Sequence, residues 1–178
     1  MIQSHRMSGD LKQKVREVPD FPTPGISFKD IMPLLGDPEA LRDTVDRLGD
    51  WAAERGPDIV VGGEARGFFI GSAIAYKLGC GFVPARRPGK LPLDVISAEY
   101  ELEYGRNSLE LQTGSIREGS KVLIHDDVLA TGGTSRAMAQ LVEQLGGVVI
   151  GHAFIIELGF LDGRKALEGY DVFSLIEY

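Results

Sequence analysis

Short apolar runs that alternate with helix-like segments constrain the fold of this chain more than any other feature. Four such runs cover residues 59–61, 81–84, 121–124 and 148–150. A short run without polar alternation is typical of a strand that is buried on both faces of a sheet. Strands of this kind, separated by helices, predict an α/β fold with a central, mostly parallel sheet flanked by helices. Ligands of such sheets bind at the carboxyl ends of the strands, so site residues are expected there.

Residues with helical spacing lie between and before these runs. The clearest stripe recurs every three to four residues and consists of Leu41, Val45, Leu48 and Ala52. An aspartate and a proline precede this helix, and Gly56-Pro57 ends it. Segments 67–78 and 138–145 predict two more helices, and residues 11–18 predict a further one that ends before Pro19.

One segment departs from this order, because residues 100–104 and 108–111 both alternate between polar and apolar side chains. A short turn-forming stretch, Gly105-Arg106-Asn107, lies between them. This pattern predicts an antiparallel hairpin that projects from the sheet. Projecting loops commonly serve as lids over a site.

Composition excludes several classes of protein. Acidic residues outnumber basic residues by 26 to 19, and the net charge of −7 disfavours a nucleic-acid partner. The single cysteine, Cys80, excludes a disulfide framework and is typical of a reducing compartment. The longest apolar stretch, residues 67–76, is about half of the roughly 20 residues that a membrane span needs, and residues 1–7 carry no apolar targeting region. We therefore expect a cytoplasmic protein that acts on small molecules, with no nucleic acid and no membrane as partner.

Length and glycine content add two expectations. The 178 residues contain no repeat or linker, so we expect a single domain over residues 1–178, with residues 1–10 as a flexible N-terminal extension. Glycine accounts for 23 of the 178 residues, and this share is nearly twice the average glycine frequency of about 7%. This excess predicts that backbone groups, rather than side chains, form parts of a binding site.

The strongest motif is the stretch His-Asp-Asp-Val-Leu-Ala-Thr-Gly-Gly-Thr-Ser at residues 125–135, directly after an apolar run. Asp126 and Asp127 would come at the carboxyl edge of the strand, where they suit ribose hydroxyls or a cation. Gly132 and Gly133 let backbone N–H groups approach an anion such as a phosphate at the start of the next helix. A Walker A loop and a dinucleotide fingerprint are both absent from the sequence. The alternative is a capped helix preceded by two solvated acids.

Two further stretches carry cations. Residues 62–67, Gly-Gly-Glu-Ala-Arg-Gly, again join a strand to a helix, and Arg66 could clamp a phosphate or form an ordinary surface ion pair. Residues 86–90 place Arg86, Arg87 and Lys90 within five positions. Such a run is either a solvated loop or a clamp on an anionic leaving group.

The order of apolar strand, acid pair and Ala-Thr-Gly-Gly-Thr loop resembles the phosphoribosyl pyrophosphate signature of type I phosphoribosyltransferases. The resemblance implies their fold, with a small hood and a projecting β-hairpin loop. It implies that the 5′-phosphate and ribose of the donor are bound by Asp126, Asp127, Ala130, Thr131, Gly132, Gly133 and Thr134. It places the pyrophosphate over a non-proline cis peptide at Glu64–Ala65, with contacts from Glu64, Ala65, Arg66, Arg86 and Lys90. It also implies Mg²⁺ as cofactor, carried by the donor near Asp126 and Asp127, without an assigned protein ligand.

Four other strings, at residues 19–31, 63–68, 87–92 and 102–105, are similar to the adenine-specific branch of this family. Together the resemblance covers about residues 15–178. It implies an adenine pocket with Phe28 against the purine and backbone groups near Ile26 and Lys29 reading its edge. It implies that Glu103 exchanges a proton with the base, in a flexible loop that also contains Tyr104. From the residues alone, Phe28 would be a core residue and Glu103 part of a solvated strand face.

The resemblance implies transfer of a 5-phosphoribosyl group to adenine, which gives AMP and diphosphate in purine salvage, with Glu103, Asp126 and Asp127 as catalytic residues. One alternative is the same reaction with hypoxanthine, guanine or xanthine. Another is a non-catalytic regulator that senses the donor and binds nucleic acid, which the net charge disfavours. Family members are usually dimeric, which implies a homodimer with Arg86 reaching the neighbour's site. His125 and Pro88 depart from the family pattern; His125 is interpreted as a variant strand end, and the role of Arg87 stays open.

Overall fold

The structure is a computed structural model that describes residues 10–101 and 106–178. The chain divides into two compact units, residues 1–44 and residues 45–178, and each is described by itself. Residues 1–9 of the predicted N-terminal extension lie outside the described residues.

The first unit contains a small antiparallel hairpin and the start of a long helix. A 3₁₀ helix, η1 (Leu11–Lys14), leads into β1 (Arg16–Val18), which pairs with β2 (Phe28–Asp30). The short helix α1 (Met32–Gly36) follows, and then α2 (Pro38–Ala53) continues into the second unit. The carboxylate of Asp37 accepts the N–H groups of Glu39 and Ala40 at 3.0 and 3.1 Å, so α2 begins with the predicted N-cap.

The helix predicted over residues 11–18 is wrong. Helical structure stops at Lys14, and Val15 already has an extended backbone with φ −94° and ψ 125°. Val15 and Val18 are β-branched and favour extended structure, and Val18 lies opposite Phe28 in the hairpin. Three apolar residues are too few to distinguish a helical from a strand period when a pairing partner lies further along the chain.

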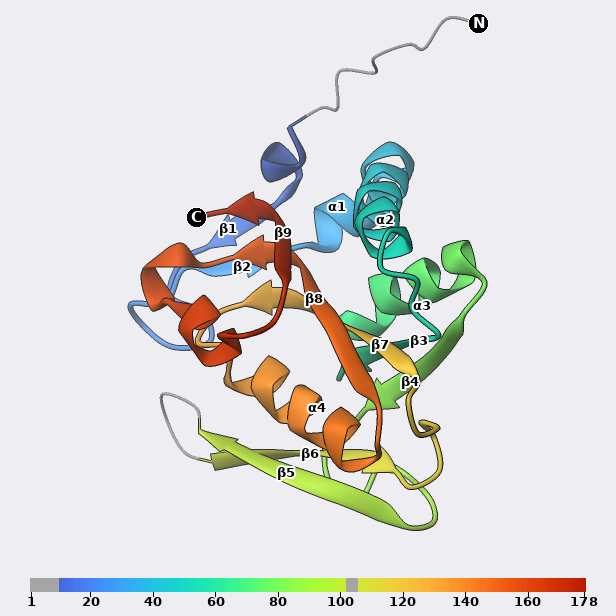
Figure 1. The fold of residues 1–178 in the computed structure, drawn as a ribbon. Coiled ribbons are helices and arrows are strands. Elements are labelled where there is room, and N and C mark those ends of the chain that lie inside the picture. The colour runs from blue at the N-terminus through green and yellow to red at the C-terminus, as the bar shows by residue number, and fades with distance from the viewer. Residues whose placement is uncertain (1–9, 102–105) are drawn as a thin grey trace, which may run out of the picture. The chain divides into compact units, whose positions relative to one another are not determined.

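The second unit is built on a five-stranded parallel sheet (Figure 1). Its strands, in spatial order, are β4 (Gly81–Ala85), β3 (Ile59–Gly63), β7 (Lys121–Leu129), β8 (Val148–Glu157) and β9 (Val172–Glu177). Every neighbouring pair is parallel, which confirms the predicted α/β fold with a central parallel sheet. Strand β9 was not predicted, because its apolar and polar residues form no continuous run.

Two helices cover opposite faces of this sheet. Helix α3 (Gly67–Leu78) joins β3 to β4, and α4 (Gly133–Gln144) joins β7 to β8 (Figure 1). The two connections run in opposite directions across the sheet, so right-handed crossovers put the helices on different sides. Both helices lie where the sequence predicted them. Two 3₁₀ helices, η2 (Gly159–Leu161) and η3 (Gly163–Leu167), follow β8.

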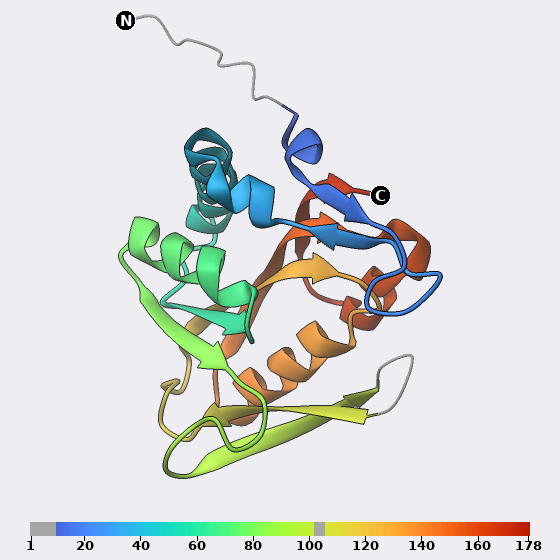
Figure 2. The ribbon, with the colours of Figure 1, turned by 180° about the vertical axis from the view of Figure 1, so that it is seen from behind.

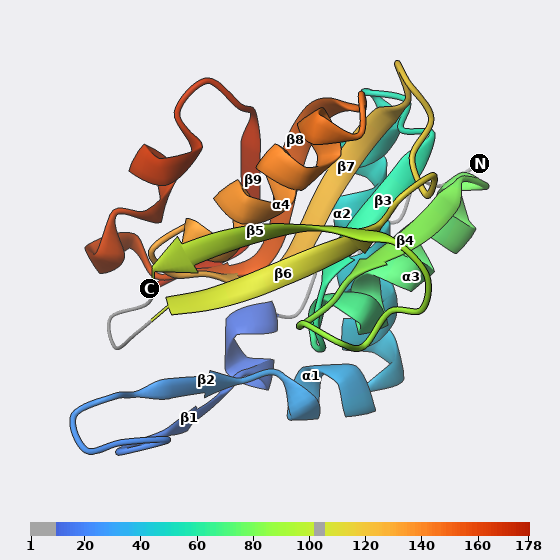
Figure 3. The same cartoon turned by 90° about the horizontal axis from the view of Figure 1, so that it is seen from below.

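The predicted antiparallel hairpin is confirmed as β5 (Val95–Glu101) paired with β6 (Arg106–Gln112), but its predicted bounds are wrong. Arg106 and Asn107 were expected in the turn, whereas they pair with Glu101 and Tyr100 and so belong to β6. It lies beside α4, as Figures 2 and 3 show. Leu109 and Leu111 are buried in a cluster with Met138 and Val142 of α4, which anchors the hairpin by apolar burial. Residues 102–105 between the two strands, including Glu103 and Tyr104, lie outside the described residues. Across the described ranges, no helix combines the length and apolar character needed to cross a membrane.

Candidate active site

The acid pair lies where β7 runs past its neighbour β3. Strand β3 pairs with β7 only as far as Gly62 opposite His125, whereas β7 continues beside β8 to Leu129. Asp126 and Asp127 are therefore inside a longer strand than residues 121–124 predicted, but beyond the last pair with β3. This register directs the acid pair toward the loop that follows β3.

Burial and an ion pair set the charge state of these two acids. The Asp127 side chain is 5% exposed, and its Oδ2 lies 3.0 Å from Nε of Arg66. Burial, together with the adjacent charge of Asp127, raises the pKa of Asp126 well above its ordinary value. Burial also raises the pKa of Asp127, although Arg66 opposes this shift. The alternative of two solvated acids is wrong, since Asp127 is buried and Asp126 is half-buried, and the pKa of both carboxyl groups is raised.

Two glycines of the loop at residues 62–67 leave room for this pair. A Cβ atom added to Gly63 would lie 2.9 Å from Oδ2 of Asp126. A Cβ atom added to Gly67 would lie 2.9 Å from the backbone oxygen of His125. Because such contacts are too close, any side chain at these positions would displace the loop or the acid pair.

The loop at residues 130–134 connects β7 to the N-terminus of α4. Gly132 has φ +83°, and its carbonyl accepts the N–H of Arg136 at 2.9 Å in the first helical turn. The first N–H groups of a helix have no acceptor within it, so this end suits an anion. Beside it, an open cavity of about 320 Å³ is lined by Glu99, Tyr100, Thr131, Gly133, Arg136, Ala137, Gln140 and Ala166.

The same loop packs closely on η3. A Cβ atom added to Gly132 would meet the Gly163 carbonyl, and one added to Gly163 would meet the Ala130 carbonyl. The two backbones are therefore in direct contact through paired glycines.

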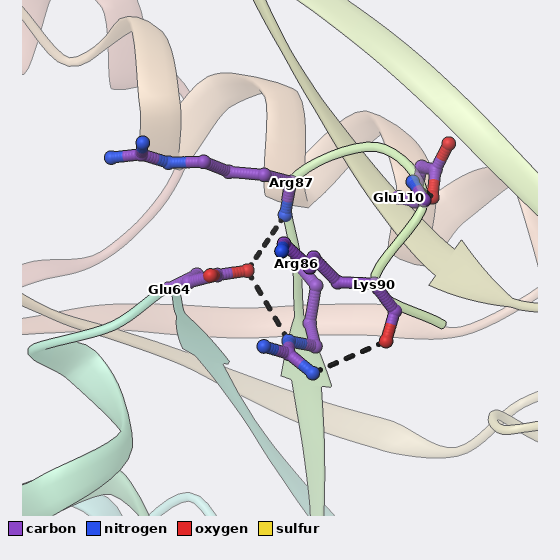
Figure 4. Close-up of polar contacts among 6 residues, drawn as sticks. Glu64, Arg86, Arg87, Lys90 and Glu110 are labelled. Carbon is purple, nitrogen blue, oxygen red and sulfur yellow. Dashed lines mark hydrogen bonds and ion pairs between the residues drawn. The ribbon is translucent and has the colours of Figure 1, made fainter. Parts of the chain in front are cut away.

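A second carboxylate, Glu64, joins the loop at residues 62–67 to residues 86–90, here called the basic loop. The peptide bond between Glu64 and Ala65 is cis, as the resemblance implied. Oε2 of Glu64 accepts Nε of Arg86 at 3.2 Å and the backbone N–H of Arg87 at 2.9 Å (Figure 4). Burial would raise the pKa of Glu64, but the Arg87 N–H and the Arg86 guanidinium hold this pKa below its ordinary value. Glu64 is therefore a stable anion that faces the basic loop.

The cations of the basic loop differ in direction. Figure 4 shows the Arg86 side chain turned toward Glu64, whereas Arg87 contacts Glu64 through its backbone N–H and its side chain extends past the carboxylate. Arg86 also donates from Nη1 to the carbonyl of Lys90 at 3.2 Å. Arg86 is thus held by the chain itself, so the basic loop is not simply a solvated run of charges. Arg66 is likewise ion-paired, but with the buried Asp127 rather than with a surface acid.

The residues predicted for an adenine pocket belong to the first unit. The Phe28 ring meets Phe21 edge-on, with ring centroids 5.2 Å apart. The N–H and carbonyl of Ile26 are both bonded inside the turn, to Thr23 and Phe21. Lys29 pairs with Glu17 at 2.8 Å. Their role toward a base stays a prediction, as does that of Glu103 and Tyr104, which lie outside the described residues.

His125 is a buried core residue in the middle of β7, not the strand end that was predicted, because pairing with β8 continues to Leu129. Its Nδ1 lies 2.9 Å from the carbonyl of Ala153, and burial lowers the pKa of the ring to about 4, so it is neutral. The part of the chain that the structure describes contains no group of three or more His, Cys, Asp or Glu side chains placed to hold a metal ion.

Sequence reasoning missed Glu110 on β6. This side chain is buried, and its Oε2 accepts the N–H of Gly89 in the basic loop at 3.1 Å. Its backbone also exchanges two hydrogen bonds with Arg86, at 3.0 and 2.7 Å. The only signal in the sequence was an acid between two buried leucines, which also describes an ordinary exposed strand position.

Comparisons with known proteins agree with this geometry. The family model of the phosphoribosyl transferase domain matches residues 39–175. A curated adenine phosphoribosyltransferase of Alkaliphilus metalliredigens is 57% identical over 169 residues, which cover 95% of this chain and 99% of the relative. The crystal structure of the enzyme from Thermoanaerobacter pseudethanolicus has a TM-score of 0.92 and 52% identity, and the match covers 94% of this chain and 98% of that one.

The enzyme from Saccharomyces cerevisiae, solved with an imino-altritol bisphosphate and adenine, has a TM-score of 0.87 and 41% identity, with coverage of 93% and 96%. The type I phosphoribosyltransferase fold accounts for the parallel sheet and for the two glycine loops at its carboxyl edge. With this likeness in sequence and fold over nearly the whole chain, the protein belongs to the phosphoribosyl transferase family and, within it, to the adenine phosphoribosyltransferases.

Proposed function

We propose that the protein transfers the 5-phosphoribosyl group of phosphoribosyl pyrophosphate to N9 of adenine and releases AMP and diphosphate. The observation that carries this proposal is the acid pair between two glycine loops, in which Asp127 is buried and ion-paired to Arg66. The yeast relative was solved with a sugar-like bisphosphate and adenine, which are the two ligand types that such a reaction needs.

Each of the two glycine loops would bind a different phosphate group of the donor. The 5′-phosphate would bind the first N–H groups of α4, with Thr131 and Thr134 adding hydroxyl donors. The ribose hydroxyls would donate hydrogen bonds to Asp126 and Asp127. The pyrophosphate would lie over Glu64–Ala65 and accept hydrogen bonds from Arg66, Arg86 and Lys90, so Arg66 and Arg86 would exchange a carboxylate partner for a phosphate.

The bond from C1′ to the pyrophosphate oxygen breaks as the bond from C1′ to N9 forms. As in glycoside cleavage, positive charge develops on the ribosyl group, and the nearby acid pair stabilises it. Arginine and lysine stabilise the negative charge on the leaving group. Glu103 would exchange a proton with the base, and the hairpin would exclude water that otherwise hydrolyses the donor.

Magnesium fits this site as a companion of the donor. Mg²⁺ is usually held by one or two carboxylates together with substrate phosphates. Asp127 is buried, with its Oδ2 paired to Arg66, and Asp126 is the next residue, so two neighbouring carboxylates could hold the metal once Arg66 turns to a phosphate. When bound, the metal would neutralise charge on the departing diphosphate.

The adenine pocket would be formed by Ile26, Phe28 and Lys29, with Phe28 stacked on the purine. Hypoxanthine, guanine and xanthine are the alternative bases, because a pocket that reads the base edge with backbone groups does not reveal its choice through side chains.

The protein is proposed to act in the cytoplasm as a homodimer, in purine salvage, with residues 1–178 as one functional domain. Exposed apolar side chains support the dimer. Phe69 and Tyr76 lie two turns apart on the same face of α3 and are 50% and 90% exposed. Leu93, after the basic loop, is 85% exposed. Large apolar side chains that are exposed to solvent favour association with a second copy.

A base panel tests the proposed function. Purified protein, Mg²⁺ and the donor are incubated with adenine, hypoxanthine, guanine or xanthine, and the nucleotides are separated by chromatography. AMP from adenine alone is the expected result. Formation of IMP, GMP or XMP instead would support the alternative bases, and a folded protein that forms no nucleotide would contradict the proposal. Light scattering during gel filtration measures the oligomeric state.

A further inference from the structure

The basic loop is held between two carboxylates that come from different elements. Glu64, at the carboxyl end of β3, binds the loop where it begins, at Arg86 and Arg87. Glu110, on strand β6 of the hairpin, binds it at Gly89. Figure 4 shows the loop between them. Of the two, Glu110 has no place in the reaction proposed above.

Glu110 makes its contacts in two ways. Its backbone forms an antiparallel bridge with Arg86, which joins the hairpin to the end of β4. Its side chain reaches further along the loop, where Oε2 accepts the N–H of Gly89 at 3.1 Å. Gly89 has φ +74°, so the turn that presents this N–H is one that other residues rarely adopt. The backbone bridge alone would not fix this turn.

The conformation at Gly89 also determines where the Arg86 side chain lies. Arg86 donates a hydrogen bond to the carbonyl of Lys90, the residue after Gly89. An acceptor that fixes Gly89 therefore also fixes the carbonyl that orients Arg86. Lys90 itself is carried by the same turn, so both cations depend on one buried carboxylate.

We propose that Glu110 is a positioning residue for binding of the pyrophosphate group: through Gly89 it holds the basic loop in the conformation that presents Arg86 and Lys90. The inference rests on the proposed function only in naming the donor's pyrophosphate as the ligand. Glu110 does not touch the substrate, and its effect falls on affinity for the pyrophosphate group rather than on binding of the base. Pre-organised cations bind with less loss of conformational freedom, which is the physical advantage of such an anchor.

Three substitutions separate this role from a general effect on folding. Glu110→Ala removes the acceptor, whereas Glu110→Asp keeps a carboxylate but draws it back by one methylene. Glu110→Gln keeps an amide oxygen that can still accept the Gly89 N–H. Glu118→Ala, an exposed glutamate in the loop after β6, is the matched control. The backbone bridge and the buried leucines beside Glu110 remain in every variant.

Two measurements are made on each variant. Isothermal titration calorimetry with Mg²⁺ and inorganic pyrophosphate gives a dissociation constant that does not depend on turnover. Steady-state kinetics give KM for the donor, KM for adenine and kcat. We expect Glu110→Ala and Glu110→Asp to raise the pyrophosphate dissociation constant and the donor KM about tenfold, the effect of losing one hydrogen bond to a charged acceptor. KM for adenine should change less than about twofold, and Glu110→Gln and Glu118→Ala should stay within about threefold of the parent protein on all constants.

Other outcomes overturn the inference. Unchanged pyrophosphate affinity in folded Glu110→Ala and Glu110→Asp would do so, as would equal increases in both KM values. If Glu110→Ala does not fold, Glu110→Asp and Glu110→Gln still give the comparison. If the parent protein binds pyrophosphate but forms no AMP, the proposed function fails while the calorimetry still tests Glu110.

Discussion

Nε of Arg66 lies 3.0 Å from Oδ2 of Asp127, and this ion pair joins the loop after β3 to the acid pair of β7. The two partners differ in burial, because the Arg66 side chain is 38% exposed and that of Asp127 is 5% exposed. The exposed partner can turn toward an incoming phosphate, while the buried one stays fixed in its strand. Binding of a polyanion at Arg66 would therefore change the electrostatic environment of the acid pair.

Replacement of Asp126 should separate activity from stability. Asp126→Asn is expected to lower the rate of AMP formation by about 100-fold or more, because a charge that stabilises the ribosyl transition state is lost. Its melting temperature at pH 7 should be unchanged or higher. The folded-state pKa of Asp126 lies above the ordinary value of 3.8, so its ionisation weakens the folded state as pH rises through that range. Melting curves at pH 4 and pH 7 check this sign, and a marked loss of stability at pH 7 would contradict it.

Arg66→Lys should raise KM for the ribosyl donor about tenfold, since an ammonium group cannot form the two parallel hydrogen bonds of a guanidinium. KM for adenine should stay close to that of the parent protein. Arg117→Lys, at an exposed position in the loop after β6, is the control and should leave all constants unchanged. Equal behaviour of the two variants would argue against Arg66 as a phosphate ligand.

Gly67→Ala should lower the free energy of unfolding by about 1–3 kcal/mol, because the added Cβ would lie 2.9 Å from the His125 carbonyl. The donor KM should also rise, since Asp126 lies within the same contact. Gly36→Ala provides the comparison: its Cβ would meet no atom within 4 Å, and the change should be neutral or stabilise α1 by up to about 1 kcal/mol. Urea denaturation measures both, and equal stability of the two variants would be inconsistent with the close contact at Gly67.

His152 should make the protein sensitive to mild acid. Its ring is buried between Phe154 and Tyr170, neither ring nitrogen has a hydrogen-bond partner within the described ranges, and burial lowers its pKa to about 4. Between pH 6.5 and 4, His152 is protonated in the unfolded chain but remains neutral in the folded protein. The free energy of unfolding should therefore fall as pH decreases in this window, by about 1.4 kcal/mol per pH unit for each such histidine.

His152→Leu removes the pH dependence that comes from His152. The contribution of His125 remains, because burial lowers the pKa of that ring to about 4 as well. The slope of unfolding free energy against pH between 6.5 and 4 should consequently be smaller in the variant by about that amount per unit. Denaturation at pH 7, 6 and 5 measures it. Parallel slopes for variant and parent would show that His152 is protonated in the folded state.

Much of the fold could be predicted from sequence because the relevant signals are local. The strands at residues 59–61 and 121–124 are short apolar runs, and α2 has both a cap and a stripe. Strand β1 could not be predicted, because its extended state depends on pairing with residues 28–30, a contact that no local pattern records.

In the candidate site, too, local features could be predicted and contacts between distant segments could not. The acid pair and its glycine loop are contiguous in sequence, so the placement of Asp126 and Asp127 beside that loop could be predicted. The ion pair from Arg66 to Asp127 and the bond from Glu110 to Gly89 join segments far apart in the chain. Such contacts follow from strand order and register, which composition and spacing do not specify.

The facing glycines Gly132 and Gly163 have a consequence for sequence change. At each of these glycines, the position that a Cβ atom would take is already occupied by backbone of the other segment. A side chain on either one would therefore force the two segments apart. A substitution at one position has no compensating substitution at the other, since glycine is already the smallest residue. In a library that randomises both positions, cells are selected for growth that depends on the enzyme making AMP from supplied adenine. Survivors should carry glycine at both sites, so the two positions would be selected together.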